Sequence, residues 1–325
     1  MGRPGTAVEP IPGAPAPFRS DMISKVLLLL VVASLVLAAG TIYQAAGARL
    51  SARRHGPPGA LIDVDGQRLH VVRGGAGPLS VVFESGVAAS SLSWTRVMPG
   101  VAAFSRVCAY DRAGLGWSGA ATTARTVDRI VAELRGVVAH AATPGPAVLV
   151  GHSFGAFLVL VYVARHPEEV AGVVALDPPT EWQDLTAARA TLLRRGIQAS
   201  RLGGVLARLG VVRASLALLT GGAPGVTRGG IRVLGPRAVR TLEHLGALPA
   251  MGTAASRVAS LDDLPLVIVS AGDQPEEIVA KHRGLASLSS RGRHVVATRS
   301  DHWIHLDEPE LVVEIVRGIV DGARG

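Results

Sequence analysis

One serine of this chain stands in a pattern that can turn a hydroxyl into a nucleophile. Ser153 is flanked by Gly151 and Gly155, and this stretch follows one apolar run, residues 147–150, and opens another, residues 156–164. A strand, a glycine-flanked serine and a helix in that order indicate a sharp turn that exposes the serine above a sheet edge. The glycines leave the room that such a strained backbone requires. A serine hydroxyl reacts at neutral pH only when a base takes its proton, so the chain must supply one.

Among the ten histidines, His302 is the best placed to be that base. It follows the last predicted strand and precedes the last predicted helix, so it reaches the sheet edge that carries Ser153. His305 is the local rival, although its neighbours lead into the helix. A histidine in this loop could instead have a structural role, such as capping or orienting it. The sequence therefore predicts His302 as the general base.

A carboxylate must fix the tautomer of that imidazole and stabilise the imidazolium. Asp273 lies shortly after the seventh predicted strand, and it completes the chain order serine, acid, histidine that this architecture favours. Asp177, at the end of the preceding strand, is the alternative acid. Asp301 adjoins the base and would have to bend back on it, so we expect it to be solvated. We therefore take Asp273 as the acid and keep Asp177 open.

Acyl transfer also requires two N–H groups that bind the charged oxygen of the tetrahedral intermediate, each contributing about 2.7–4 kcal/mol. The residue after the nucleophile, Phe154, supplies one. We expect the other from the loop after the third predicted strand, where Gly86 brings the backbone close, and assign it to the N–H of Val87. Gly86 would otherwise be an ordinary turn glycine.

The elements that position these groups can be predicted from apolar patterning. Short β-rich runs alternate with helical patterns from Ala60 onward, which indicates a mostly parallel sheet with helices on both faces. Asp65-Gly66 is a two-residue turn signal, so the first two strands pair as a hairpin. The predicted strands are 60–64, 68–73, 80–84, 107–110, 147–150, 170–176, 266–270 and 294–298. The predicted helices are 91–104, 124–141, 154–165, 276–288 and 310–320.

The chain divides into a long folded region and an N-terminal extension. Residues 180–262 break the alternation, and an insertion of that length is most economically a helical cap over the carboxyl edge of the sheet, where ligands bind in open α/β sheets. We predict a disordered tail at 1–21, a transmembrane anchor or signal segment at 22–48, a linker at 49–59, the core at 60–179 and 263–325, and the cap at 180–262.

The composition fits a globular protein with a large core, because 48% of the 325 residues are hydrophobic. The formal net charge is +8, and the stretch from Glu181 to Asp263 has 11 Arg against 5 Asp plus Glu. These arginines favour anionic membrane surfaces or acidic ligands, or are solvated helix faces. Aromatic residues make up only 4% and no nucleic-acid motif appears, so we do not expect nucleic acid as a partner. The single cysteine, Cys108, is expected to be a buried strand thiol.

The 23 residues from Val26 to Ala48 carry no charge. As a helix they would reach about 35 Å, enough to cross a hydrocarbon core of about 30 Å. Tyr43 lies near one end, as an interfacial aromatic residue would. The alternatives are a buried helix or a cleaved secretory signal, because Met22 could be a start and Ala46-Gly47-Ala48 resembles a cleavage site. We expect a single-pass N-terminal membrane anchor, or secretion after signal cleavage.

Four ordered motifs resemble the α/β-hydrolase superfamily, of the kind with a helical cap after the sixth strand. The likeness runs from about Ala60 to the C-terminus and implies an eight-stranded, mostly parallel sheet whose second strand is antiparallel, and a Ser-His-acid hydrolase. It also implies that Asp111 and Arg112 organise a turn rather than react. Many members have His where this chain has Ser85, and Gly where it has Asp301. The matching pieces are Glu84-Ser85-Gly86, Tyr110 to Ser118, Gly151 to Gly155, and His302 with His305 to Pro309.

The resemblance and the site residues together imply a membrane-anchored serine hydrolase that cleaves carboxylic esters through an acyl-enzyme, without cofactor or metal. Membrane tethering and a basic, leucine-rich cap point to a lipophilic ester met near a bilayer. Serine at 153 argues against epoxide and haloalkane hydrolysis, because relatives with those activities carry aspartate there. Hydrolysis of a carbon–carbon or peptide bond by the same serine stays open. So does a membrane-anchored binding protein that has kept the fold and lost catalysis.

Overall fold

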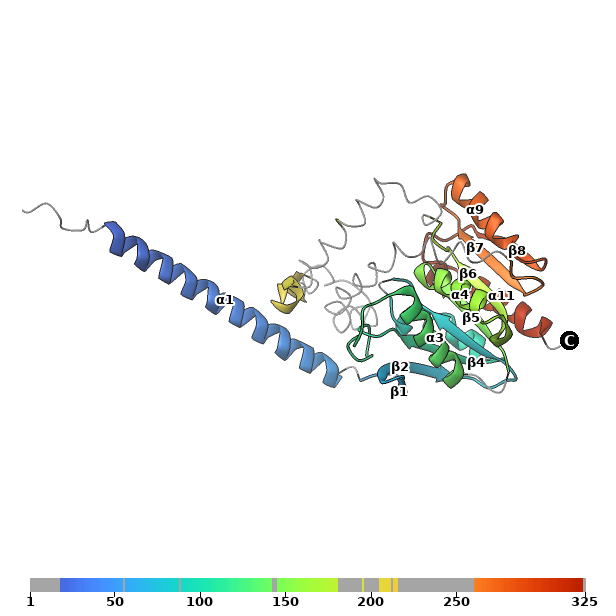
Figure 1. Cartoon of the computed structure of the whole chain (residues 1–325), viewed down its shortest axis with the longest axis horizontal. Helices are drawn as coiled ribbons and strands as arrows, with labels where there is room; N and C mark the ends of the chain where they lie inside the picture. The colour runs from blue at the N-terminus through green and yellow to red at the C-terminus, as the bar shows by residue number, and fades with distance from the viewer. Residues whose placement is uncertain are drawn as a thin grey trace, which may run out of the picture.

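The computed structural model of the protein describes residues 18–54, 56–87, 89–141, 145–180, 195, 205–211, 213–215 and 260–323. Its centre is an eight-stranded sheet in the order β1-β2-β4-β3-β5-β6-β7-β8 (Figure 1). β2 runs antiparallel to both neighbours, and all other pairings are parallel, as predicted. The strands are β1 (Ala60–Val64), β2 (Gln67–Gly74), β3 (Ser80–Glu84), β4 (Arg106–Asp111), β5 (Ala147–His152), β6 (Val170–Leu176), β7 (Leu266–Ala271) and β8 (Gly292–Ala297).

The local sequence explains where strands form and turn. Every residue of β5 is buried, as expected for a central parallel strand that is covered on both faces. β1 and β2 form the predicted hairpin, with Val64 opposite Gln67. Asp65 and Gly66 both have positive φ, 50° and 76°, which a two-residue type I′ turn requires.

Helices cover both faces of the sheet and divide the core into two layers. Within β3, Val82 packs into one layer and its neighbours Val81 and Phe83 into the other, because successive side chains point to opposite faces. The first layer is covered by α3 (Val127–Ala141), α4 (Phe154–Arg165) and α9 (Glu276–Ala286). The second is covered by η1 (Ser91–Trp94), α2 (Met98–Ala102), α10 (Ile304–Asp307) and α11 (Pro309–Gly322).

One predicted helix is broken in two. The pattern over residues 91–104 predicts a single helix, whereas the structure has η1 followed by α2. Pro99 lies in the first turn of α2. Proline has no N–H to continue a preceding helix but fits the first turn of a new one, which explains the division.

The strand order creates a topological switch point at the carboxyl edge of the sheet. β3 lies between β4 and β5, so the next strand along the chain pairs with one side of β3 and the strand after that pairs with the other side. Ligands bind at such a switch point in open α/β sheets. Glu84 at the end of β3 is paired with Gly151 of β5, which brings the loops that follow these two strands together.

A long N-terminal helix lies outside the sheet domain. α1 (Phe18–Arg54) projects from the domain near β1 and β2 (Figure 1). Its stretch Asp21–Leu50 is the one span among the described residues that is long and apolar enough to cross a membrane, with a mean hydropathy of 2.6. A membrane anchor and a signal sequence both meet this criterion.

The helix is longer than the predicted segment at both ends. It begins at Phe18, inside the expected tail, and ends at Arg54, inside the expected linker. Pro57 and Pro58 are the first prolines after it, so the helix continues almost to them. The predicted cap, residues 180–262, lies mostly outside the described residues. Within it, residues 205–208, 211 and 213–215 are helical.

Candidate active site

Ser153 occupies the turn between β5 and α4 with a strained backbone. Its φ is 53° and its ψ −122°, a conformation that costs a residue with a side chain about 1–3 kcal/mol. A Cβ at Gly155 would lie 2.3 Å from the carbonyl oxygen of Glu84, and a Cβ at Gly151 would lie 2.5 Å from that of Gly155. The N–H of Ser153 donates to the carbonyl oxygen of Leu176 at 2.8 Å. Close packing and β6 therefore hold the strained turn in place.

His302 lies at the same sheet edge, in the loop between β8 and α10. The Nε2–H of His152, the residue before Ser153, donates to the carbonyl oxygen of His302 at 2.7 Å. The rings of His152 and His302 lie 4.7 Å apart between centroids. The side chain of His302 is 45% exposed, so its imidazole remains open to a substrate. The predicted nucleophile and base thus come from distant parts of the sequence to neighbouring positions.

The carboxylate that contacts His302 is that of Asp177, the alternative acid. Asp177 Oδ2 lies 2.6 Å from His302 Nδ1. Asp273, the preferred acid from the sequence, is exposed on the turn after β7. The contact predicted for Asp273 is therefore made by Asp177 instead, and we correct the assignment accordingly.

The turn after β7 explains why Asp177, and not Asp273, contacts His302. The N–H of Gly272 donates to the carbonyl oxygen of Ser300 at 2.9 Å, so the chain turns directly after the strand. Asp273 follows Gly272 directly and is exposed. The next residue, Gln274, reaches the site, and its Nε2 donates to Asp177 Oδ2 at 2.7 Å.

Asp177 is held as a carboxylate by its surroundings. Its side chain is 2% exposed, and besides His302 and Gln274 it accepts a hydrogen bond from the N–H of Ala271 at 3.3 Å. Burial alone would raise its pKa, but these hydrogen bonds lower the pKa below its ordinary value. An ionised Asp177 accepts the Nδ1–H of His302, which makes Nε2 the basic nitrogen.

The two predicted oxyanion donors belong to backbone that adjoins Ser153. A Cβ at Gly86 would lie 3.6 Å from the Cβ of Ser153 and 3.0 Å from Nδ1 of His152, so glycine allows this close approach. The next residue, Val87, is half-buried. Phe154 begins α4, and the first N–H groups of a helix have no acceptor within it. Binding of an oxyanion by these two N–H groups stays a prediction.

A buried guanidinium holds the loop that carries Val87. The Arg112 side chain donates to the carbonyl oxygens of Ser85, at 2.6 Å, and of Gly86. The same guanidinium forms an ion pair with the buried carboxylate of Glu84. Because a trans peptide is planar, the carbonyl of Gly86 and the N–H of Val87 point in opposite directions. Because Arg112 binds that carbonyl, the N–H of Val87 points away from the Arg112 guanidinium.

Ser85 also supports this loop. Its hydroxyl donates to the carbonyl oxygen of Ser90 at 3.0 Å and accepts a hydrogen bond from Nε1 of the buried Trp94 at 3.0 Å. In place of the histidine that the family resemblance implies, this chain thus has a small side chain that is hydrogen-bonded within the protein.

The rival histidine, His305, is buried beneath the site. Its ring lies 4.4 Å from that of His152 and 4.6 Å from that of Trp94, and neither ring nitrogen has a hydrogen-bond partner among the described residues. Burial, with a smaller contribution from His302, lowers the pKa of His305 to about 3. Burial also lowers the pKa of His152 well below its ordinary value. Both rings are neutral at pH 7, which leaves His302 as the histidine of this cluster suited to accept a proton.

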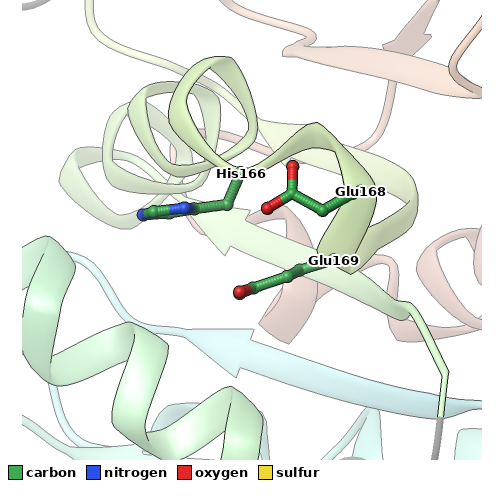
Figure 2. A group of neighbouring side chains, drawn as sticks. All are labelled: His166, Glu168 and Glu169. Carbon is green, nitrogen blue, oxygen red and sulfur yellow. The ribbon is translucent and has the colours of Figure 1, made fainter.

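One group of side chains has the chemistry of metal ligands. His166, Glu168 and Glu169 gather where α4 ends, on and beside η2 (Pro167–Glu169), with ligand atoms within 4.8 Å of one another (Figure 2). The group lies where β6 begins, at the edge of the sheet opposite Ser153. Glu169 is already bonded by Arg135 Nη2 at 2.6 Å and by the Tyr162 hydroxyl. These contacts account for the acidic cluster as part of the structure, and we assign it no role in the candidate site.

The family model described as alpha/beta hydrolase fold matches residues 80–216, which include Ser153 and Asp177. The chain is 27% identical over 257 residues to the uncharacterized protein YqjL of Bacillus subtilis, covering 77% of this chain and 87% of that protein. It is 24% identical over 275 residues to 2-(acetamidomethylene)succinate hydrolase of Mesorhizobium japonicum, covering 80% and 94%.

Among solved structures, a thermophilic esterase from Thermogutta terrifontis is similar, with a TM-score of 0.65 and 16% identity. The match covers 82% of this chain and 97% of the esterase. At this identity the likeness concerns the fold.

Proposed function

Because the chain belongs to the α/β-hydrolase fold superfamily, we propose that it cleaves carboxylic esters, with Ser153 as nucleophile, His302 as general base and acid, and Asp177 as the orienting carboxylate. The observation that carries this proposal is the 2.6 Å contact between His302 Nδ1 and buried Asp177 Oδ2, at the edge on which strained Ser153 stands. This arrangement gives the histidine the tautomer that a serine hydroxyl requires.

The first half of the reaction acylates the serine. Ser153 Oγ attacks the ester carbonyl carbon while its proton moves to Nε2 of His302. The carbonyl oxygen takes up negative charge and accepts hydrogen bonds from the N–H groups of Val87 and Phe154. The bond to the alcohol oxygen then breaks, and the alcohol leaves with the proton from His302. The acyl group remains bonded to Ser153.

Water completes the reaction. His302 takes a proton from a water molecule, whose oxygen adds to the acyl carbon. The bond to Ser153 Oγ breaks, the proton returns to that oxygen, and the carboxylic acid leaves. The proposed reaction requires neither a cofactor nor a metal. The neutral rings of His152 and His305 add no positive charge beside the imidazolium that forms twice in the cycle.

We further propose that α1 is retained as a single-pass membrane anchor. The uncharged run from Val26 to Ala48, with Tyr43 near its end, supports this. Membranes that contain the full chain should keep it after washing with alkaline carbonate. A shortened chain in the soluble fraction would instead indicate cleavage of a signal segment.

A substrate panel tests the reaction class. With the full chain in detergent micelles, aryl esters of increasing acyl length should be hydrolysed, and the lipophilic members should have the higher kcat/KM. Ser153→Ala should abolish turnover of all of them. Cleavage of a peptide or a carbon–carbon bond by a chain that leaves every ester intact would contradict the ester assignment while preserving the serine mechanism.

A further inference from the structure

The described part of the predicted cap touches α1. A Cβ at Gly40 would lie 2.4 Å from the carbonyl oxygen of Leu209, and a Cβ at Gly210 would lie 3.0 Å from the carbonyl oxygen of Gly40. The two backbones are therefore in direct contact at these glycines. Figure 1 shows this cap segment, drawn in yellow, beside α1.

The contact uses one face of α1. Gly40, Gln44 and Gly47 are spaced by four and three residues, so they lie on the same side of the helix, and all three are half-buried. Arg213 of the cap donates from Nε to Gln44 Oε1 at 3.0 Å, and a Cβ at Gly47 would lie 2.9 Å from the Arg213 side chain. Small residues that let helices approach closely are typical of packing within membranes.

The docked segment leaves large apolar side chains uncovered. Val205, Leu206 and Val211 are 51%, 36% and 45% exposed in the described structure. The neighbouring helix α1 also exposes large apolar side chains, and its Leu29, for example, is 72% exposed. Large exposed apolar side chains on two elements that contact each other indicate an interaction site.

Tyr43 indicates the depth of the contact. Tyrosines of membrane helices gather at the interface with water, and Gly40 lies three residues before Tyr43, about 4.5 Å along the helix axis. Backbone docked at that level would lie at the boundary between headgroups and acyl chains. Arg208 is exposed on the same segment, and an arginine beside apolar residues is typical of interfacial segments.

We infer that residues 205–211 of the cap are embedded in the bilayer interface beside α1, so that the lipid bilayer is a partner of the cap as well as of the anchor. The inference rests on the proposed retention of α1 in the membrane. Its consequence is that a lipophilic ester reaches the cap without leaving the bilayer, and that α1 positions the cap as well as tethering the chain.

An environment-sensitive fluorophore on single introduced cysteines tests this in the full chain. The one native cysteine, Cys108, is buried at 2% exposure and should not be labelled. In phosphatidylcholine vesicles containing nitroxide-labelled lipid, the probe at Leu206→Cys should be quenched like one at Leu29→Cys in α1. A probe at Glu310→Cys, exposed on the sheet domain, should not be quenched.

The possible outcomes separate the two proposals. Quenching at position 29 but not at 206 would overturn this inference and leave the anchor intact. Absence of quenching at both positions would overturn both.

A second pair of variants tests the docking contact. In the chain labelled at 206, Gly40→Leu should abolish the quenching, because the new side chain meets the Leu209 carbonyl. Ala38→Leu, exposed on the opposite face of α1, should leave the quenching unchanged. Unchanged quenching at position 29 confirms that Gly40→Leu remains inserted. Persistent quenching at 206 in Gly40→Leu would contradict positioning of the cap by α1.

Discussion

The residue that follows a strand decides the chemistry at this sheet edge. Asp177 directly follows β6 and its N–H donates to the carbonyl oxygen of Val269 at 2.7 Å, which fixes the backbone beside β7. Its carboxylate is thereby buried against His302. Asp273 lies on the same sheet edge, but two residues beyond its strand, and is exposed. A shift of one residue position separates the carboxylate that contacts His302 from one that is exposed.

Matched substitutions distinguish the two acids. Asp177→Asn should lower kcat for an aryl ester by about 10⁴, because the amide favours the wrong tautomer of His302. Asp273→Asn should leave kcat nearly unchanged, and it serves as the control because the change of charge is the same. Steady-state kinetics of the two purified variants provide the comparison. The reverse order of the two losses would restore Asp273 as the acid.

The acid stability of the protein should depend on His305. Its folded pKa is about 3, below the ordinary value of 6.5, so between these values the unfolded chain binds the proton more readily. The contribution of the neutral, buried ring is complete above about pH 6.5 and declines as the pH falls toward 3, at most by about 1.4 kcal/mol per pH unit. His305→Phe should flatten this decline, measured as the free energy of unfolding against pH.

Denaturant titrations at pH 7.5 give the reference values. At that pH we expect the free energies of unfolding of His305→Phe and the wild type to differ by less than about 1.5 kcal/mol, because the two side chains are similar in size. Parallel curves for the variant and the wild type down to pH 4 would show that His305 does not titrate with the predicted shift.

Among the elements, the loop after β3, residues 85–87, which we propose carries an oxyanion donor, is held by the residue that follows β4. Arg112 follows β4 and reaches under the loop after β3, which it can do because these strands are neighbours in the sheet. Its forked guanidinium binds Glu84 and two loop carbonyls at once. A lysine would keep the charge but lacks the planar fork.

Arg112→Lys should therefore lower kcat for an aryl ester by about 10–10², a fraction of the 10²–10³ that removal of a whole oxyanion donor costs. KM should change little, because the loop acts mainly on the developing negative charge. Arg129→Lys is the matched control, because Arg129 lies on α3 and its contact there is an ion pair with Glu133 at 3.7 Å. A rise in KM with kcat unchanged would indicate that Arg112 shapes the binding pocket instead.

The elements were largely predictable, because their signals are local. Each predicted strand falls within two residues of an observed one, since buried parallel strands appear as short apolar runs between turn residues. The serine turn and the histidine loop could be found for the same reason. The partner of His302 could not, because two aspartates followed neighbouring strands and only the path of the turn after Gly272 separates them.

The contacts by which Arg112 and Glu84 hold the loop after β3 were also not predicted. Glu84 and Arg112 both stand in motifs visible in the sequence, and the family resemblance assigned Arg112 to its own turn. Their pairing depends on β3 lying beside β4, a long-range fact of sheet order. Such contacts cannot be derived from the local sequence pattern.

On the scale of the whole molecule, the residues of the proposed catalytic site lie at one edge of the sheet. Ser153 follows β5 at the carboxyl edge, and the segments after β6 and β8 bring Asp177 and His302 to the same edge. Gly40 of α1 contacts Leu209 and Gly210 of the predicted cap. We therefore propose that α1 both anchors the chain and positions residues 205–211 beside it.

Reaction of the full chain with a fluorophosphonate, followed by peptide mass analysis, tests the central claim most directly. We predict one phosphonyl group on Ser153 of the wild type, none after Ser153→Ala, and much slower labelling after Asp177→Asn. A wild-type chain that remains unlabelled, as expected of a binding protein that has lost catalysis, or a Ser153→Ala chain labelled as fast as the wild type, would contradict a nucleophilic serine at this position.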